Sequence, residues 1–173
     1  MGMGMARVVS EIVARARTAQ SEFEASDQNT IDDTVCALAW VILEPRRNRA
    51  LSEQAVADTG MGSVEDKILK NHRKTLGLLR DLKRVRTVGV IGEYPERGVT
   101  EIARPVGVVF AITPSTNPVA TPTNKVLNAV KGGNAIVLAP SPKGEATAAR
   151  LVAYFQAALQ GVGAPTELVQ KLP

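Results

Sequence analysis

The stretch that decides the fold, residues 103–142, reads ARPVGVVFAITPSTNPVATPTNKVLNAVKGGNAIVLAPSP. It holds two apolar runs, residues 106–112 and 135–138, which are separated by a polar loop, a segment of helical spacing and a Gly-Gly turn. Continuous, β-branched runs are typical of strands that a parallel sheet covers on both faces. The pattern therefore predicts a strand, a helix and a second parallel strand, with both strands buried.

Each predicted strand is followed by a loop rich in proline and hydroxyl side chains. The first loop, residues 113–118, reads TPSTNP, and the second, residues 139–142, reads APSP. Ligands of parallel sheets bind outside the carboxyl ends of the strands. The two loops therefore form the candidate ligand site of the chain.

The composition narrows the class of protein. The 173 residues suffice for one domain, or for one domain and part of another. The net charge of +4 is modest and aromatic residues make up only 3%, so we expect no nucleic-acid partner. A single cysteine excludes an internal disulfide and fits a reducing compartment. No apolar run approaches the length of a membrane span, so we expect a cytoplasmic protein without membrane contact.

Four helices are expected before the two strands. The first covers residues 6–25, and Thr30 is the expected N-cap of the second. Pro45 ends the second helix or begins the third, which stops at Gly60. Ser63 then caps a fourth helix, which is expected to reach about residue 85.

The remaining segments complete the expected architecture. Residues 87–91 and 99–103 flank a turn-rich segment and predict an antiparallel ribbon. Residues 143–160 predict a helix whose return strand would begin where the chain stops, at Pro173. We therefore expect an α/β fold with N-terminal helices, a β-ribbon and the first part of a doubly wound parallel sheet, cut short within a domain.

Four stretches carry a resemblance to a known family. They read TGMGSVEDK at residues 59–67 with Lys70 and Asn71 following, TPSTNP at 113–118, GNAI at 133–136 and APSP at 139–142. In this combination the sequence resembles the N-terminal part of the aldehyde dehydrogenase superfamily. It is most similar to the coenzyme-A-acylating branch, which includes the acylating dehydrogenases of acetaldehyde, propionaldehyde and sulfoacetaldehyde.

The resemblance implies an aldehyde dehydrogenase-like fold with a Rossmann-like sheet. It assigns residues 6–86 to a helical region of the cofactor-binding domain, residues 87–103 to an oligomerisation ribbon, and residues 104–173 to the first half of the NAD(P)-binding unit. It also implies that a cysteine thiolate attacks a small aldehyde, that hydride passes to NAD⁺ or NADP⁺, and that coenzyme A takes the acyl group. For the full-length protein it implies a homo-oligomer.

Two departures from the family pattern bear on the site. Most members carry the asparagine of the oxyanion hole two residues after the loop proline, whereas Asn117 stands three residues after Pro114. Residue type favours Asn117 as the oxyanion donor and ungapped spacing favours Thr116, but an amide is the better-attested donor. Many members also place a ribose-binding lysine where this chain has Ala139. The resemblance assigns cofactor binding to residues of both loops: Ile112, Thr113, Pro114, Ser115, Ala139, Pro140 and Ser141.

The nucleophile of the implied reaction is missing from this sequence. The family's catalytic cysteine belongs to a later domain, and the one cysteine here, Cys36, falls on the apolar face of the second expected helix. A buried structural thiol is expected there. We therefore expect the 173-residue chain alone to be inactive and to bind NAD weakly. Two alternatives stay open: a non-acylating aldehyde dehydrogenase that forms a carboxylate, and a non-enzymatic assembly module.

The other polar residues favour structural roles. His72 is expected on a solvated helix surface, as is Lys125, for which the nicotinamide end of the site is the alternative. The basic run at residues 80–86 is expected to be a solvated helix end, with binding of coenzyme A phosphates as the alternative. Asn134 is expected to accommodate unusual backbone angles at the Gly-Gly turn. No metal site is expected, and delivery into a bacterial microcompartment is the alternative to a cytoplasmic location.

Overall fold

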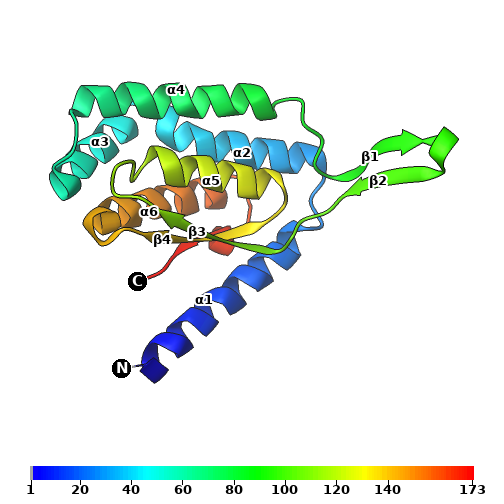
Figure 1. The fold of residues 1–173 in the computed structure, drawn as a ribbon, viewed down its shortest axis with the longest axis horizontal. Helices are drawn as coiled ribbons and strands as arrows, with labels where there is room; N and C mark the ends of the chain where they lie inside the picture. Colours follow the sequence, from blue (N-terminus) through cyan, green and yellow to red (C-terminus); the bar gives the residue numbers. More distant parts are fainter. Residues whose placement is uncertain (1) are drawn as a thin grey trace.

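The N-terminal half of the chain is helical in the computed structural model, which describes residues 2–173 (Figure 1). The four helices are α1 (Gly2–Phe23), α2 (Gln28–Leu43), α3 (Pro45–Thr59) and α4 (Val64–Leu82). Helix α2 is the central helix of this region, because it contacts α3, α4, α5 and α6. The expected helix count is confirmed.

Capping side chains and a proline set where these helices begin. The expectation that Thr30 caps α2 is wrong: the Asp27 carboxylate accepts a hydrogen bond from the Thr30 N–H at 2.8 Å, so Thr30 lies inside the first turn. The carboxylate offers two acceptor oxygens, which makes it a strong cap for orphan N–H groups. Pro45 begins α3, and Ser63 caps α4 through the Asp66 N–H at 3.1 Å.

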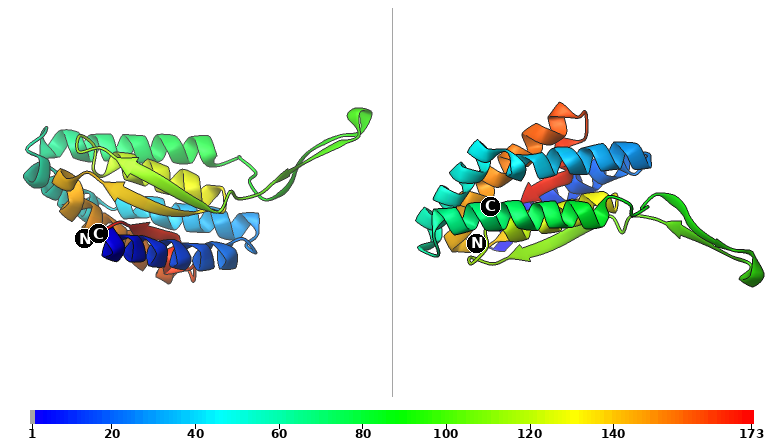
Figure 2. Two further views of the ribbon diagram at one scale, coloured as in Figure 1. Left: turned by 60° about the horizontal axis from the view of Figure 1, so that its bottom comes forward. Right: turned by 90° about the horizontal axis from the view of Figure 1, so that it is seen from above.

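The ribbon follows α4 and leaves the body of the molecule. Strands β1 (Gly89–Tyr94) and β2 (Val99–Ala103) pair antiparallel around a short 3-10 turn, η1 (Pro95–Arg97). Figures 1 and 2 show this ribbon projecting beyond the helices and the sheet. Exposed apolar side chains are spread over both of its strands: Val90, Ile91, Tyr94, Val99 and Ile102.

The remainder of the chain forms the parallel sheet. Its strands are β3 (Val108–Thr113), β4 (Ala135–Pro140) and β5 (Val169–Lys171), in the order β3-β4-β5. The crossovers contain α5 (Ala120–Lys131) and then η2 (Pro142–Gly144), α6 (Glu145–Gly161) and η3 (Thr166–Leu168). Helix α1 contacts all three strands, while α5 and α6 pack between the sheet and α2 (Figure 2). The expected α/β architecture is confirmed. The expectation that the return strand after α6 begins only at Pro173 is wrong, because β5 already pairs in parallel with β4.

The expectation that both strands of the βαβ unit are buried holds for β4 and is wrong for β3. Strand β4 lies in the centre of the sheet, and its residues 135–138 are buried. Strand β3 is an edge strand, in which Ala111 and Thr113 are buried while Phe110 and Ile112 are 58% and 74% exposed. Alternate residues of a strand point to opposite faces. One face of β3 is therefore open at its carboxyl end.

Asn134 fixes the start of β3, and not through unusual backbone angles as expected. Within residues 2–173 no residue other than glycine has a positive φ, and Gly133 takes the turn with φ 73°. The Asn134 Oδ1 atom instead accepts the N–H groups of Val106 and Gly107 at 2.7 and 2.9 Å. Its Nδ2 donates to the carbonyls of Ala129 and Gly132. This side chain thereby joins the end of α5 to the beginning of β3.

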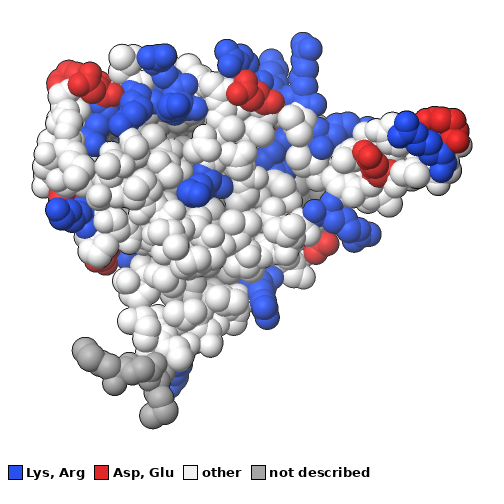
Figure 3. All heavy atoms as spheres, viewed as in Figure 1, with Lys and Arg blue, Asp and Glu red and all other residues white. Residues whose placement is uncertain are grey.

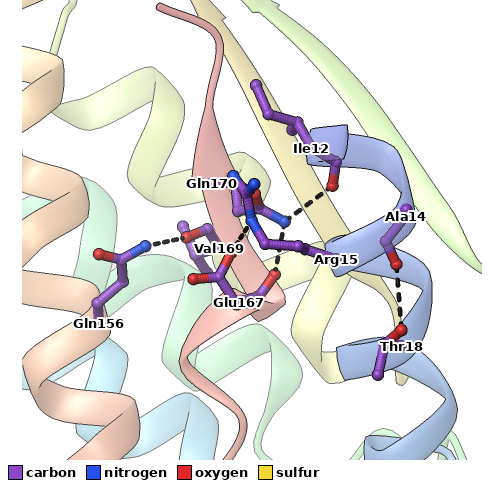
Figure 4. Close-up of polar contacts among 8 residues, drawn as sticks. All are labelled: Ile12, Ala14, Arg15, Thr18, Gln156, Glu167, Val169 and Gln170. Carbon is purple, nitrogen blue, oxygen red and sulfur yellow. Dashed lines mark hydrogen bonds and ion pairs between the residues drawn. The ribbon is translucent and has the colours of Figure 1, made fainter. Parts of the chain in front are cut away.

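Helix α1 is bonded to β5 and to the turn before it (Figure 4). The Arg15 guanidinium donates to Glu167 at 3.0 Å and to the Gln170 side-chain carbonyl at 3.1 Å. The buried Gln170 amide donates in turn to the Ile12 carbonyl at 3.1 Å. From the other side, Gln156 of α6 donates to the Val169 carbonyl at 3.0 Å. These bonds hold the short strand β5 against its neighbours.

Candidate functional site

The two loops singled out from the sequence lie side by side. Strands β3 and β4 pair in parallel with Ile112 opposite Ala139 and Thr113 opposite Pro140. Four of the residues assigned to cofactor binding are therefore direct neighbours across the ladder. Both loops leave the sheet at the same end, as expected because they follow the carboxyl ends of parallel strands.

Two contacts join the loops beyond the last ladder pair. The Ser141 N–H donates to the Thr113 carbonyl at 3.1 Å. Gly144 in turn packs against Pro118, where an added Cβ would lie 3.0 Å from the proline Cβ. Only glycine fits that approach without displacing the first loop. Sequence reasoning missed Gly144, because no sequence pattern indicates which proline it would face.

The surface between the loops is open and mixed in character. Ile112 and Pro114 are exposed, while Ser115, Ala139, Pro140 and Ser141 are half-buried. The Thr113 side chain is buried, so it offers no surface to a ligand. Within residues 2–173 the Ser141 hydroxyl makes no hydrogen bond, which leaves it able to bond a ligand hydroxyl. An apolar surface with one such hydroxyl suits a nucleoside.

Asn117 lies where the first loop enters α5. Its backbone carbonyl accepts the Thr121 N–H at 3.4 Å, two residues before Val119, the N-cap of α5. Its Nδ2 atom has only a long contact of 3.4 Å to the Thr116 hydroxyl, which is exposed. Its Oδ1 atom is buried without a hydrogen-bond partner. Leaving a buried carbonyl unpaired costs about 1–3 kcal/mol, and such groups are rare in native proteins.

The expectation of a buried thiol at Cys36 is wrong, because the residue is exposed. Cys36 follows the buried Val35 on α2 and lies at the edge of the helix's packed face. Partial burial raises the pKa of the thiol, and the nearby Asp32 and Asp33 raise it further. The thiol therefore stays protonated at neutral pH, which is unfavourable for a nucleophile.

The other candidate groups are dispersed. His72 and Lys125 are both exposed on their helices. Across residues 2–173, no group of three His, Cys, Asp or Glu side chains is arranged to hold a metal ion. Over the same residues, none of the helices combines the length and the apolarity that crossing a bilayer requires.

Comparison with known proteins gives a consistent picture. The family model described as "Aldehyde dehydrogenase family" matches residues 2–173. The chain is 62% identical over 168 residues to a sulfoacetaldehyde dehydrogenase (acylating) of Cupriavidus necator, and the match covers 97% of this chain and 34% of that protein. It is 39% identical over 162 residues to a succinate-semialdehyde dehydrogenase (acetylating) of Clostridium kluyveri, with 94% and 35% covered. The chain spans about a third of the length of these curated relatives.

Solved structures share the fold. An acetylating aldehyde dehydrogenase from Geobacillus thermoglucosidasius superposes with a TM-score of 0.91 at 37% identity, covering 98% of this chain and 37% of that chain. The propionaldehyde dehydrogenase of Rhodopseudomonas palustris with bound propionyl-CoA gives a TM-score of 0.81 at 28% identity, with 94% and 35% covered. The helices, the ribbon and the parallel sheet therefore match the corresponding part of these proteins.

Proposed function

Because the chain belongs to the aldehyde dehydrogenase family, we propose that it is the N-terminal part of an enzyme that converts a small aldehyde into an acyl-coenzyme A. The oxidant is NAD⁺ or NADP⁺, and the acyl group passes through a cysteine thioester. The observation that carries this proposal is the 62% identity to an acylating dehydrogenase over nearly the whole chain. The structure with bound propionyl-CoA supports coenzyme A as co-substrate.

In this proposal Asn117 is the oxyanion donor. Its amide stands at the carboxyl end of β3 and is held by no strong internal bond, so it is free to donate to an aldehyde oxygen as negative charge develops. Thr116, its exposed neighbour, is the alternative donor. The thiolate is assigned to a segment outside this sequence, because Cys36 lies on α2 with a raised pKa.

The two loops would hold the nicotinamide cofactor. Ile112 and Ala139 offer apolar contact, the Ser141 hydroxyl offers a ribose partner, and the bond from Ser141 to the Thr113 carbonyl fixes their spacing. Bound NAD⁺ or NADP⁺ supplies the hydride acceptor. Pro114, Ser115 and Pro140 complete the assigned surface, which is half-buried or exposed.

The division of the chain follows the same proposal. Residues 6–86 and 104–173 belong to the cofactor-binding domain, and residues 87–103 form the oligomerisation ribbon. The exposed apolar side chains of β1 and β2 support this role, because such patches mark contact surfaces. The enzyme would act as a homo-oligomer in the cytoplasm.

Sulfoacetaldehyde is the first substrate to test, given the name of the 62% identical relative. The complete gene product is incubated with the aldehyde, NAD⁺ or NADP⁺, and coenzyme A, and the products are identified by mass spectrometry. We expect the acyl-coenzyme A to form in a coenzyme-A-dependent reaction, and the 173-residue chain alone to be inactive. A carboxylate formed without coenzyme A would contradict the proposal and favour the non-acylating alternative.

A further inference from the structure

The ribbon meets the body of the molecule at two roots, residues 87–88 before β1 and residues 104–107 after β2. Beyond these roots, β1 and β2 pack chiefly on each other and on the turn η1 between them. Figure 3 shows the ribbon standing clear of the body, with Lys or Arg and Asp or Glu side chains at its tip. The direction of the ribbon is therefore set at the roots.

Close packing does not hold the roots on all sides. A cavity of about 190 Å³ lies between them and the Gly-Gly turn after α5, and its lining includes Thr87, Ala103, Pro105 and Gly132. A space of this size leaves the roots without the dense packing of a protein interior on that side. The direction of the ribbon therefore depends on the polar contacts that the roots make.

The first root is held by Gln28 of α2. Its Oε1 atom accepts the Thr87 N–H at 2.7 Å, and its Nε2 atom donates to the Thr87 hydroxyl at 3.3 Å. The same Nε2 atom donates at 3.0 Å to Asp32, one turn later on α2. Asp32 also accepts from the ammonium group of Lys131, the last residue of α5. A continuous chain of bonds thus joins Thr87 to the end of α5.

The ion pair at the end of this chain is asymmetric. The Lys131 side chain is only 3% exposed, whereas that of Asp32 is 38% exposed. A buried ammonium group that loses its carboxylate is strongly unfavourable, so the lysine holds Asp32 in one arrangement. Asp32 then offers a fixed acceptor to the Gln28 amide.

The second root is held at the same end of α5. The Asn134 Oδ1 atom accepts the N–H groups of Val106 and Gly107, and its Nδ2 atom donates to the Gly132 carbonyl. Lys131 and Asn134 therefore enclose one short turn, and this turn anchors both roots. Four side chains form the resulting root clamp: Gln28, Asp32, Lys131 and Asn134.

We propose that the root clamp positions the ribbon for assembly with a second copy of the chain, and that Lys131 acts in it through Asp32 and Gln28. The proposal rests on the proposed oligomerisation role of the ribbon and specifies what makes that surface competent. The six residues of β1 span about 20 Å, so a rotation of about 10° at the roots moves the tip by about 3 Å. This shift is close to the spacing of successive residues in a strand, so it would misalign the exposed apolar side chains with their partners.

The test measures assembly of the complete gene product. Sedimentation velocity over a concentration series gives the dissociation constant of the oligomer for the unmodified protein, for Gln28→Ala and for Lys131→Met. Gln54→Ala is the matched control for the glutamine, because it removes a similar bond to Asp58, one turn later on α3 and away from the ribbon (Figure 1). Lys67→Met is the control for the loss of a buried lysine, since Lys67 lies in the first turn of α4. We expect each clamp variant to weaken assembly about tenfold or more, the effect of one bond to a charged group, and the controls to leave it nearly unchanged.

Two further measurements separate positioning from a loss of fold. Lys131→Met should still fold, because Asp32 is exposed enough to stay hydrated. Hydrogen exchange followed by mass spectrometry should therefore become faster at the two roots of the clamp variants and stay unchanged in α6. Because Lys131 acts through Gln28, the double variant should weaken assembly no more than Gln28→Ala alone.

Three outcomes would overturn the proposal. The first is unchanged assembly in both clamp variants. The second is an equal weakening in the controls, or faster exchange throughout the chain, which would indicate a general structural effect. The third is an additive loss in the double variant, which would show that Lys131 does not act through Gln28. If the unmodified gene product is monomeric, the proposed oligomerisation role of the ribbon itself fails, and the role of the clamp in assembly fails with it.

Discussion

The backbone N–H of Ser141 donates to the carbonyl of Thr113 across 3.1 Å and so joins the loops that follow β3 and β4. The sheet register alone aligns the strands only as far as Thr113 and Pro140. Beyond this pair, the hydrogen bond and the contact of Gly144 with Pro118 keep the second loop against the first. The position of Asn117 therefore depends on residues more than twenty positions later in the chain.

Gly144→Ala should destabilise the protein. The new Cβ would lie 3.0 Å from the Pro118 Cβ, so the loops must separate. We expect a loss of about 1–3 kcal/mol, the usual cost of overpacking a tight contact. Gly161→Ala is the matched control, because nothing lies within 4 Å of its added Cβ. Urea unfolding followed by circular dichroism measures both, and equal stability of the two variants would refute the role given to Gly144.

Asn134→Ala should be more damaging than a typical surface substitution. It would leave the N–H groups of Val106 and Gly107 without their acceptor, at a site that is partly buried. We expect a loss of about 2–4 kcal/mol in the free energy of unfolding. Asn128→Ala, whose side chain bonds only within α5 at the surface, should cost far less. Thermal unfolding of the two variants would show the difference, and similar melting temperatures would contradict it.

Asn117→Ala should lower kcat of the complete gene product by about 10²–10³-fold, the usual effect of losing one oxyanion donor. The KM for the aldehyde should change little, because the bond is made in the transition state. Thr116→Val provides the matched test of the alternative donor and should retain most of the activity. If Thr116→Val proves the more damaging substitution, the assignment of the donor passes to Thr116.

Stability should fall in acid because three carboxylates cap helices. Asp27 and Glu44 have lowered pKa values, chiefly through the N–H groups of Thr30 and of Arg46. At Asp58, burial is the largest effect and raises the pKa, but hydrogen bonds from Thr147 and Gln54 outweigh it and lower the pKa. The folded state therefore favours the ionised forms, and this stabilisation is present above the ordinary values near 4 and is lost as the pH falls below them.

The contribution of Asp58 to this loss of stability in acid can be measured separately. Its carboxylate accepts the N–H and the hydroxyl of Thr147 at 2.8 and 2.7 Å, at the start of α6. In urea titrations from pH 6 to pH 3, Asp58→Asn should start from a lower stability and lose less of it on acidification. A pH dependence identical to that of the unmodified chain would show that Asp58 does not contribute.

Much of the fold follows from local sequence. Proline, glycine and short polar residues marked most helix ends correctly, as at Pro45, Gly60 and Ser63. The apolar runs located β3 and β4, but an apolar run does not report how many neighbours its strand will have. The exposure of Phe110 on the edge strand β3 was therefore missed.

The candidate site was predictable in part. Parallel strands bring their carboxyl-terminal loops together, so the adjacency of Ile112 and Ala139 follows from the order of strand, helix and strand along the sequence. The contact between Gly144 and Pro118 depends on how separate helices and loops pack. The exposure of Cys36 also depends on packing. Helical spacing places this residue at the border of the apolar face, and the neighbouring helices decide whether it is covered.

The bonds between α1 and the β5 region also constrain the order of events during synthesis on the ribosome. Arg15 and Glu167 are 152 residues apart, so the first helix leaves the ribosome long before its partner is made. At ~5–20 residues per second, the delay is about 8–30 s. For that time the apolar face of α1 has no β5 to pack against, and the nascent chain is exposed to aggregation and to chaperone capture.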